Sequence, residues 1–150
     1  MKFNFQQLIN DFAVKHDQAM SGSVEDACHF SWDDIAINIY SHEENGTPTL
    51  IATVSAGHVS NRALKSLSSE ILEANYLWSG THFSTLSYNS LTEELVICDR
   101  MDVIDINVEL LSERITELFQ SAKHWQGVIN HEENKTLTAS TPVNDYSVRV

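Results

Sequence analysis

The hydrophobic pattern from Asp105 to Trp125 constrains the fold more than any other feature of the sequence. Apolar residues recur there every three or four positions, as on one face of an α-helix, and polar residues fill the positions between them. The pattern predicts a long helix with one apolar side. Because that side must be buried, another layer of structure has to cover it. The apolar stripe consists of Val108, Leu111, Ile115, Leu118, Phe119, Ala122 and Trp125.

A helix end and a pair of strands are predicted just before this long helix. Residues 71–76 close a helical pattern, and Gly80 follows where a chain that leaves a helix often needs a residue that tolerates positive φ. Residues 82–89 and 93–100 then alternate apolar and polar side chains, as half-buried antiparallel strands do. Residues 90–92 form the turn of the predicted hairpin.

The chain begins with signals for another helix. Asn4 and Gln7 fit a capping box, and Phe3 and Leu8 fit the hydrophobic staple that fixes the entry into a helix. Gly22 marks the predicted end of this helix. The apolar face is rich in aromatic rings, and a helix at the rim of a sheet could leave one ring exposed for a partner. That face is formed by Phe5, Leu8, Ile9, Phe12, Ala13 and Met20.

Three strands are predicted between the first helix and the middle of the chain. Residues 28–32 and 35–40 alternate apolar side chains with other residues, and residues 50–54 repeat the theme. The connection at residues 43–48 contains Asn45-Gly46, which is a strong local signal for a hairpin. The three strands therefore belong to an antiparallel sheet.

The middle of the chain adds a further helix, for which Ser60 or Asn61 is in position to act as the cap. The order helix, three strands, helix, two strands, helix (α-β-β-β-α-β-β-α) predicts an α+β fold with a single antiparallel sheet of about five strands and three helices. The length of the chain suits one domain, assigned to residues 1–127. Residues 128–150 lack a sustained period, and we expect them to form a mobile C-terminal tail.

The charge of the chain limits its partners. The formal net charge is −12, with only nine lysines and arginines, which are scattered. Nucleic acids are bound by clustered positive charge, so no nucleic-acid partner is expected. No apolar run approaches the roughly 20 residues of a membrane span, and the first residues resemble a capped helix rather than a signal peptide. The sequence therefore predicts a cytoplasmic protein without a membrane partner.

No catalytic or metal-binding motif occurs in the sequence. The seven histidines lack the HxxxH or HExxH spacing of metal sites, and Cys28 and Cys98 lie singly in apolar strand patterns. Neither a nucleophile elbow nor a glycine pattern for phosphates or dinucleotides is found. We expect no enzyme, no metal and no cofactor, although acid catalysis by a carboxylate pair stays open as an alternative. The pairs are Asp33/Asp34, Glu43/Glu44 and Glu93/Glu94.

Five segments of the sequence together resemble a known family. They are Phe12 to Lys15, Trp32 to Ile39, Ile71 to Trp78, Glu94 to Cys98 and Ala122 to Trp125. Combined, they resemble the class I chaperones of type III secretion, the Tir-chaperone family, over about residues 3–126. The most specific part is the passage from helix to strand built on Leu-x-Ala-Asn, with the hairpin that follows it.

The resemblance implies a homodimeric chaperone of the bacterial cytoplasm that works without ATP. Such a protein binds the N-terminal segment of one or a few secreted effector proteins and keeps it non-globular and ready for secretion, and the secretion apparatus is a further candidate partner. An extended client segment can be held by apolar grooves and by an added strand at an open sheet edge. A chaperone-like regulatory or interaction module stays open as the alternative, because a fold alone does not decide function.

The resemblance also implies two binding surfaces, and for both the alternative is that the residues belong to the core of the monomer. The alternation of Ile35, Ile37 and Ile39 puts their side chains on one face of the sheet, which we expect to pack against helices. This favours a core position for Ile37 and Ile39 over a place in an effector groove. In the family the second helix and the last two strands make the dimer, which implies Leu64, Leu67, Ile71, Leu86 and Val96. Effector grooves in the family lie over the first helix and the first three strands, which implies Phe5, Ile9, Phe12, Phe30, Trp32, Ile37 and Ile39.

Overall fold

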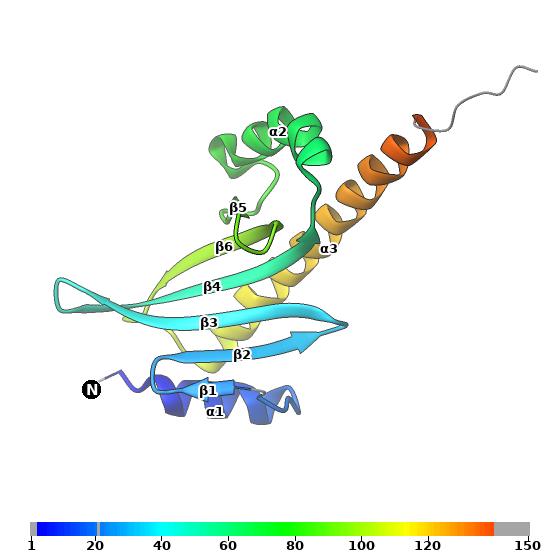
Figure 1. Cartoon of the computed structure of the whole chain (residues 1–150). Coiled ribbons are helices and arrows are strands. Elements are labelled where there is room, and N and C mark those ends of the chain that lie inside the picture. Colours follow the sequence, from blue (N-terminus) through cyan, green and yellow to red (C-terminus); the bar gives the residue numbers. More distant parts are fainter. Residues whose placement is uncertain (1–2, 21, 140–150) are drawn as a thin grey trace, which may run out of the picture.

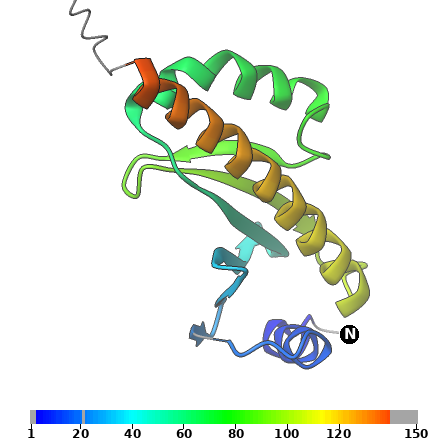
Figure 2. The same cartoon turned by 90° about the vertical axis from the view of Figure 1, so that its right-hand side faces the viewer.

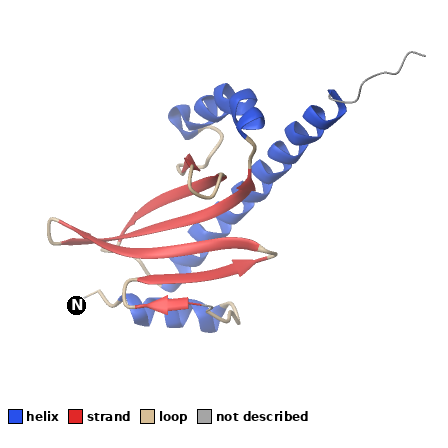
Figure 3. Cartoon of the chain, in the orientation of Figure 1, coloured by secondary structure: helices blue, strands red, loops and turns tan. Residues whose placement is uncertain are grey.

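The computed structural model describes residues 3–20 and 22–139, and the elements follow the predicted order (Figure 1). The predicted α+β fold with one antiparallel sheet is confirmed (Figure 3). A short strand, β1, and a 3-10 turn, η1, are added to it. The elements are α1 (Phe5–Lys15), β1 (Gly22–Val24), β2 (Ala27–Trp32), β3 (Ile35–Glu44), β4 (Thr47–His58), α2 (Asn61–Asn75), η1 (Tyr76–Trp78), β5 (Thr85–Asn89), β6 (Glu94–Asp102) and α3 (Val108–Ala139).

The strands lie in the order β1-β2-β3-β4-β6-β5, and all neighbours are antiparallel. β6 therefore lies between β4 and β5, and α2 with η1 carries the chain from β4 to the far edge of the sheet. Ile37 pairs with Val54, and Val54 pairs with Ile97. All three side chains are fully buried, so this row fixes the register at the centre of the sheet.

One face of the sheet is buried beneath α3, which runs across it (Figure 2). Ile35, Ile37 and Ile39 all lie on the buried face, as their alternation predicts. Arg114 of α3 also reaches this face, where its Nε donates to Oδ2 of Asp99 on β6 at 2.9 Å. The predicted stripe of α3 forms the opposite side of the core through Leu111, Ile115, Leu118, Ala122 and Trp125.

α3 is longer than the sequence pattern indicates, because it continues past Gly127 to Ala139. The expectation that regular structure ends near residue 127 is wrong for residues 128–139. Ile129 extends the apolar stripe and is only 2% exposed, so the helix still has a buried side in this region. Residues 140–150, the remainder of the expected tail, lie outside the described residues.

α1 ends at Lys15, well before the predicted end at Gly22, and Gly22 instead begins β1. The backbone N–H groups of Asp17 and Gln18 bond back into the last turn, at 3.3 and 2.9 Å, in the double pattern of a Schellman motif. Asp17 has φ +47°, the left-handed conformation that glycine usually adopts at this position. Met20 consequently lies outside the helix.

Candidate partner-binding surfaces

The residues predicted to bind an effector lie mainly inside the molecule. Trp32 is half-buried and is the one member of the set with an appreciable surface. The other members are at most 6% exposed because α1 and α3 cover them, so they form the core of the monomer in this conformation. Their role in binding stays a prediction. These buried members are Phe5, Ile9, Phe12, Phe30, Ile37 and Ile39.

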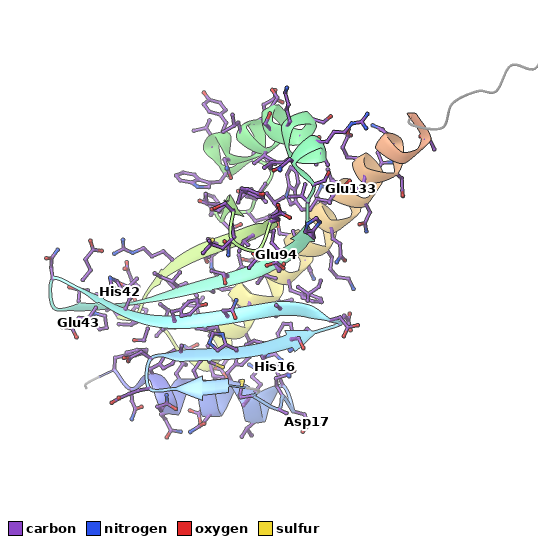
Figure 4. All side chains as sticks on the ribbon, in the orientation of Figure 1. His16, Asp17, His42, Glu43, Glu94 and Glu133 are labelled. Carbon is purple, nitrogen blue, oxygen red and sulfur yellow. The ribbon has the colours of Figure 1, made fainter. Side chains whose placement is uncertain are left out.

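Trp32, at the end of β2, joins three elements through its ring. The centroid of the ring lies 5.2 Å from that of His16, just after α1, and 5.6 Å from that of Phe119 on α3. His16 in turn forms a hydrogen bond of 2.8 Å from Nε2 to Oγ of Ser112 on α3 (Figure 4). Burial, together with the nearby charge of Lys15, lowers the pKa of His16 and so favours the neutral ring.

The sheet has open backbone groups at its β2 edge. β1 pairs only with residues 27–29 of β2, so in the described part of the chain residues 30–32 have no strand beside their outer edge. Ser41 N–H donates to the carbonyl of Asp26, and the antiparallel alternation from this bond points the N–H and C=O of Ser31 outward. β5 forms the other edge, where the side chain of Asn75 already occupies the outward N–H and C=O of Leu86. Unpaired groups such as those at the β2 edge can accept an added strand.

A hollow of about 970 Å³ lies between the start of α1 and the β3–β4 hairpin. Its lining includes Phe3 and Phe5 together with the acidic residues Glu25, Asp26 and Glu43, the last of which is labelled in Figure 4. The hollow therefore offers both apolar contact and negative charge close to β2. The full lining is Phe3, Asn4, Phe5, Gln6, Glu25, Asp26, Ser41, His42, Glu43, Gly46 and Pro48.

The residues predicted to form a dimer interface also point mostly inward. Leu67 and Ile71 of α2 and Leu86 of β5 are between 4% and 9% exposed and belong to the core. Leu64 and Val96 are half-buried. The apolar face of α2 that the 3.6-residue period identifies thus packs against the same chain, and their role in a dimer stays a prediction.

A group of large apolar side chains lies exposed next to this face, at the end of α2 and in the segment that leads to β5. We call it the α2–β5 patch. Its members are between 48% and 73% exposed, which is unusual for neighbouring residues of this size. Trp78 and Phe83 lie near each other, with ring centroids 6.2 Å apart. The patch consists of Leu72, Tyr76, Leu77, Trp78 and Phe83.

The backbone under the α2–β5 patch is strained and held in place by specific contacts. Leu77 and Phe83 have φ +52° and +68°, a conformation that costs free energy for residues with bulky side chains. The side chain of Asn75 holds the segment to β5, because it donates to the carbonyl of Leu86 at 3.1 Å and accepts from its N–H at 2.9 Å. A Cβ at Gly80 would lie 2.8 Å from the Cβ of Ala74, so only glycine fits there.

The same backbone corrects the predicted start of the first hairpin strand. β5 begins at Thr85, so residues 82–84 are not in the strand. His82 and Phe83 both have positive φ, which is incompatible with extended structure. The sequence did contain a signal for the patch, because Leu72 and Tyr76 lie off the buried stripe of α2 and need another explanation.

The paired carboxylates do not form a dry cleft. Asp33, Asp34 and Glu93 are exposed at turns, and Glu43 and Glu44 are exposed at the end of β3. Glu94, at the start of β6, accepts a hydrogen bond of 2.8 Å from Ser55 Oγ. This placement removes the geometric basis of the hydrolase alternative. Within residues 3–20 and 22–139 no group of three histidine, cysteine or acidic side chains is arranged to hold a metal. No described helix combines the length and hydrophobicity that a membrane crossing needs.

The sequence of residues 7–126 matches the model of the Tir chaperone protein (CesT) family. The match covers most of the chain and confirms the resemblance found in the five segments. A comparison with curated proteins gives no significant match.

Several solved structures share the fold. The ExsC–ExsE complex contains a chain that aligns with 86% of this chain and 97% of its own length, at 14% identity and a TM-score of 0.71. The HopA1–SchA chaperone–effector complex aligns with 82% of this chain and 93% of its own, at 14% identity and a TM-score of 0.62. The ExoU–SpcU complex of the Pseudomonas aeruginosa type III secretion system contains a chain that aligns with 81% of this chain and 97% of its own length, at 12% identity and a TM-score of 0.61.

Proposed function

The chain belongs to the Tir chaperone protein (CesT) family, and from that premise we propose that it is a type III secretion chaperone for one or a few effector proteins. It binds the N-terminal segment of the effector in the bacterial cytoplasm and keeps it non-globular. The observation that carries this proposal is the family match over residues 7–126 of a chain that folds as one layer of helices on one sheet. The chain acts by binding alone, without catalysis, ATP or a cofactor.

The client segment binds at the outer edge of β2, along residues 30–32, and extends past β1 to the hollow at the other end of this strand. The outward N–H and C=O of Ser31 offer backbone hydrogen bonds, Trp32 offers apolar surface, and the hollow accommodates side chains. Each apolar client side chain that is buried contributes roughly 1.5–3 kcal/mol. A few such side chains offset the cost of about 1–2 kcal/mol for ordering each backbone residue. An extended client can therefore be held without being folded.

A second copy of the chain covers the α2–β5 patch. Five exposed apolar side chains gather there, next to the edge strand β5. A self-complementary contact that buries the patch on both subunits gives a closed dimer in which the β2 edges stay free for clients. This dimer uses the exposed neighbours of the residues that the sequence implied, because Leu67, Ile71 and Leu86 are already buried.

The proposal is tested by co-expressing the chain with candidate type III secreted proteins of the same bacterium, beginning with any that are encoded next to its gene. The client should co-purify without ATP and should be lost when its N-terminal segment is deleted. Ser31→Pro removes the outward N–H at an edge position where proline is tolerated, whereas Ser31→Ala keeps it. We expect Ser31→Pro alone to weaken client binding. Retention that is independent of the N-terminal segment would contradict the chaperone function.

A regulatory module is the second candidate, and one structural likeness favours keeping it. YbjN from E. coli, described as a transcription regulator on a provisional basis, aligns with 87% of this chain and 93% of its own, at 13% identity and a TM-score of 0.54. The co-expression experiment separates the two functions, because a regulator of this kind would retain no secreted client.

A further inference from the structure

The N-terminus of α2 has an incomplete cap within its own segment. Ser60 is the N-cap residue, and its Oγ accepts a hydrogen bond of 3.2 Å from the N–H of Ala63. In a full capping box the residue at Ala63 would be Glu or Gln, and its side chain would bond back to the N–H of Ser60. Alanine cannot do this. The first turn of α2 also contains no acidic residue to balance the positive end of the helix dipole.

The missing carboxylate comes from α3. Oε1 of Glu133 accepts the backbone N–H of Ser60 at 2.7 Å, and Oε2 accepts the hydroxyl of the same serine at 3.0 Å. Figure 4 shows Glu133 near the junction between β4 and α2. One side chain thus satisfies the N–H that a local capping residue would have satisfied, and it places negative charge at the helix N-terminus.

Neighbouring residues of α3 keep Glu133 in this position. Ile129, one turn earlier on the same helix, is buried and anchors this part of α3 in the core. Glu132 accepts a hydrogen bond of 2.7 Å from Ser66 Oγ, one and a half turns into α2. All three residues lie beyond residue 126, where the family match ends. The contact to α2 is therefore made by a part of the chain that the family match does not cover.

We propose that Glu133 completes the capping box of α2 from a distance and that the C-terminal part of α3 thereby positions α2. α2 carries Leu72 and leads into the remainder of the α2–β5 patch, so this cap also sets the orientation of the proposed dimer surface. That last step rests on the proposed function. The cap itself is a property of one subunit and does not depend on dimer formation.

The experiment is hydrogen exchange on the full chain, with Glu133→Ala as the test variant. The amide of Ser60 and the first-turn amides of α2 should exchange about five- to tenfold faster. The loss of a cap makes the opening of the helix terminus more favourable, by about that factor in the opening equilibrium constant. Glu133→Gln keeps one acceptor but no charge, so its exchange rates at these amides should lie between those of Glu133→Ala and those of the natural chain. Asn134→Ala, on the exposed side of α3 next to the test residue, is the matched control and should change nothing at α2.

A second measurement excludes a general loss of stability. The free energy of unfolding should fall less in the double variant Ser60→Ala/Glu133→Ala than the sum of its changes in the two single variants. The reason is that each single substitution already removes the hydrogen bond between the two side chains. Unchanged exchange at residues 60–63 in Glu133→Ala, or full additivity, would overturn the proposal. If sedimentation shows that the natural chain is a monomer, the proposed dimer fails while the exchange result still decides whether the cap exists.

Discussion

At the scale of single residues, the structure separates aromatic side chains that hold the fold from those that a partner can reach. Phe12 is fully buried, with its ring 4.5 Å from that of His16 and 5.5 Å from that of Phe30. Trp32 belongs to the same cluster but keeps part of its surface. The rings of α1 are therefore buried, and Trp32 at the end of β2 is the ring of this cluster that keeps an exposed surface.

Phe12→Ala should act mainly on stability. Truncation of a fully buried phenylalanine costs about 3–5 kcal/mol, because it removes apolar contacts and leaves a cavity. The melting temperature measured by thermal denaturation should fall by a large amount, while the amount of client bound per folded molecule should change little. Val14→Ala, which alters an exposed side chain of the same helix, is the control and should leave the melting temperature nearly unchanged. If Phe12→Ala instead weakened client binding strongly and left the melting temperature nearly unchanged, Phe12 would belong to the binding surface.

At the scale of elements, α3 connects the parts of the molecule. Its first half packs across β4 and β6, and its C-terminal part contacts the start of α2. Arg114 adds a charged contact to the carboxylate of Asp99, which is nearly fully buried. The positions of α2 and the sheet thus depend on one continuous helix.

Truncation after Gly127 should destabilise the chain, whereas removal of residues 140–150 alone should not. The longer truncation removes the buried side chain of Ile129 and the carboxylate that caps α2. Loss of the apolar side chain alone costs about 2–5 kcal/mol. Urea denaturation of the two truncated forms measures the difference. Equal stability of both forms would show that residues 128–139 contribute nothing to the fold.

At the scale of the whole molecule, the distribution of apolar surface favours a dimer built back to back. The α2–β5 patch and the β2 edge belong to opposite ends of the sheet order. A contact through the patch leaves the client edge free on each subunit. The net charge of −12 keeps such an assembly soluble and gives it a long-range attraction for basic client segments.

Trp78→Asp should shift the chain toward monomer with little change in subunit stability. A charge in the α2–β5 patch opposes burial in an interface, but the side chain is 48% exposed in the subunit. Leu67→Asp should instead unfold the subunit, because Leu67 is only 4% exposed. Light scattering at micromolar concentration and circular dichroism distinguish the two outcomes. A dimer that persists in Trp78→Asp would require another interface.

The sequence by itself determined the three helices and five main strands, their order and the family. Helix periods, the cap at Asn4, the Asn-Gly hairpin and the Leu-x-Ala-Asn passage depend on contacts within a few residues along the chain, so the pattern reports them directly. The helix end at Asp17 escaped prediction because an aspartate occupies a conformation that usually identifies a glycine.

Only the tertiary structure decided which apolar residues are exposed and which are buried. Leu67 and Leu72 lie on one helix and have the same side chain, yet the first is 4% and the second 70% exposed, because α2 turns only one of them toward the core. The sequence also gave no sign that Glu133 would cap Ser60, which lies 73 residues earlier. Burial and distant capping depend on which elements meet in space, and that is settled by packing of the whole chain.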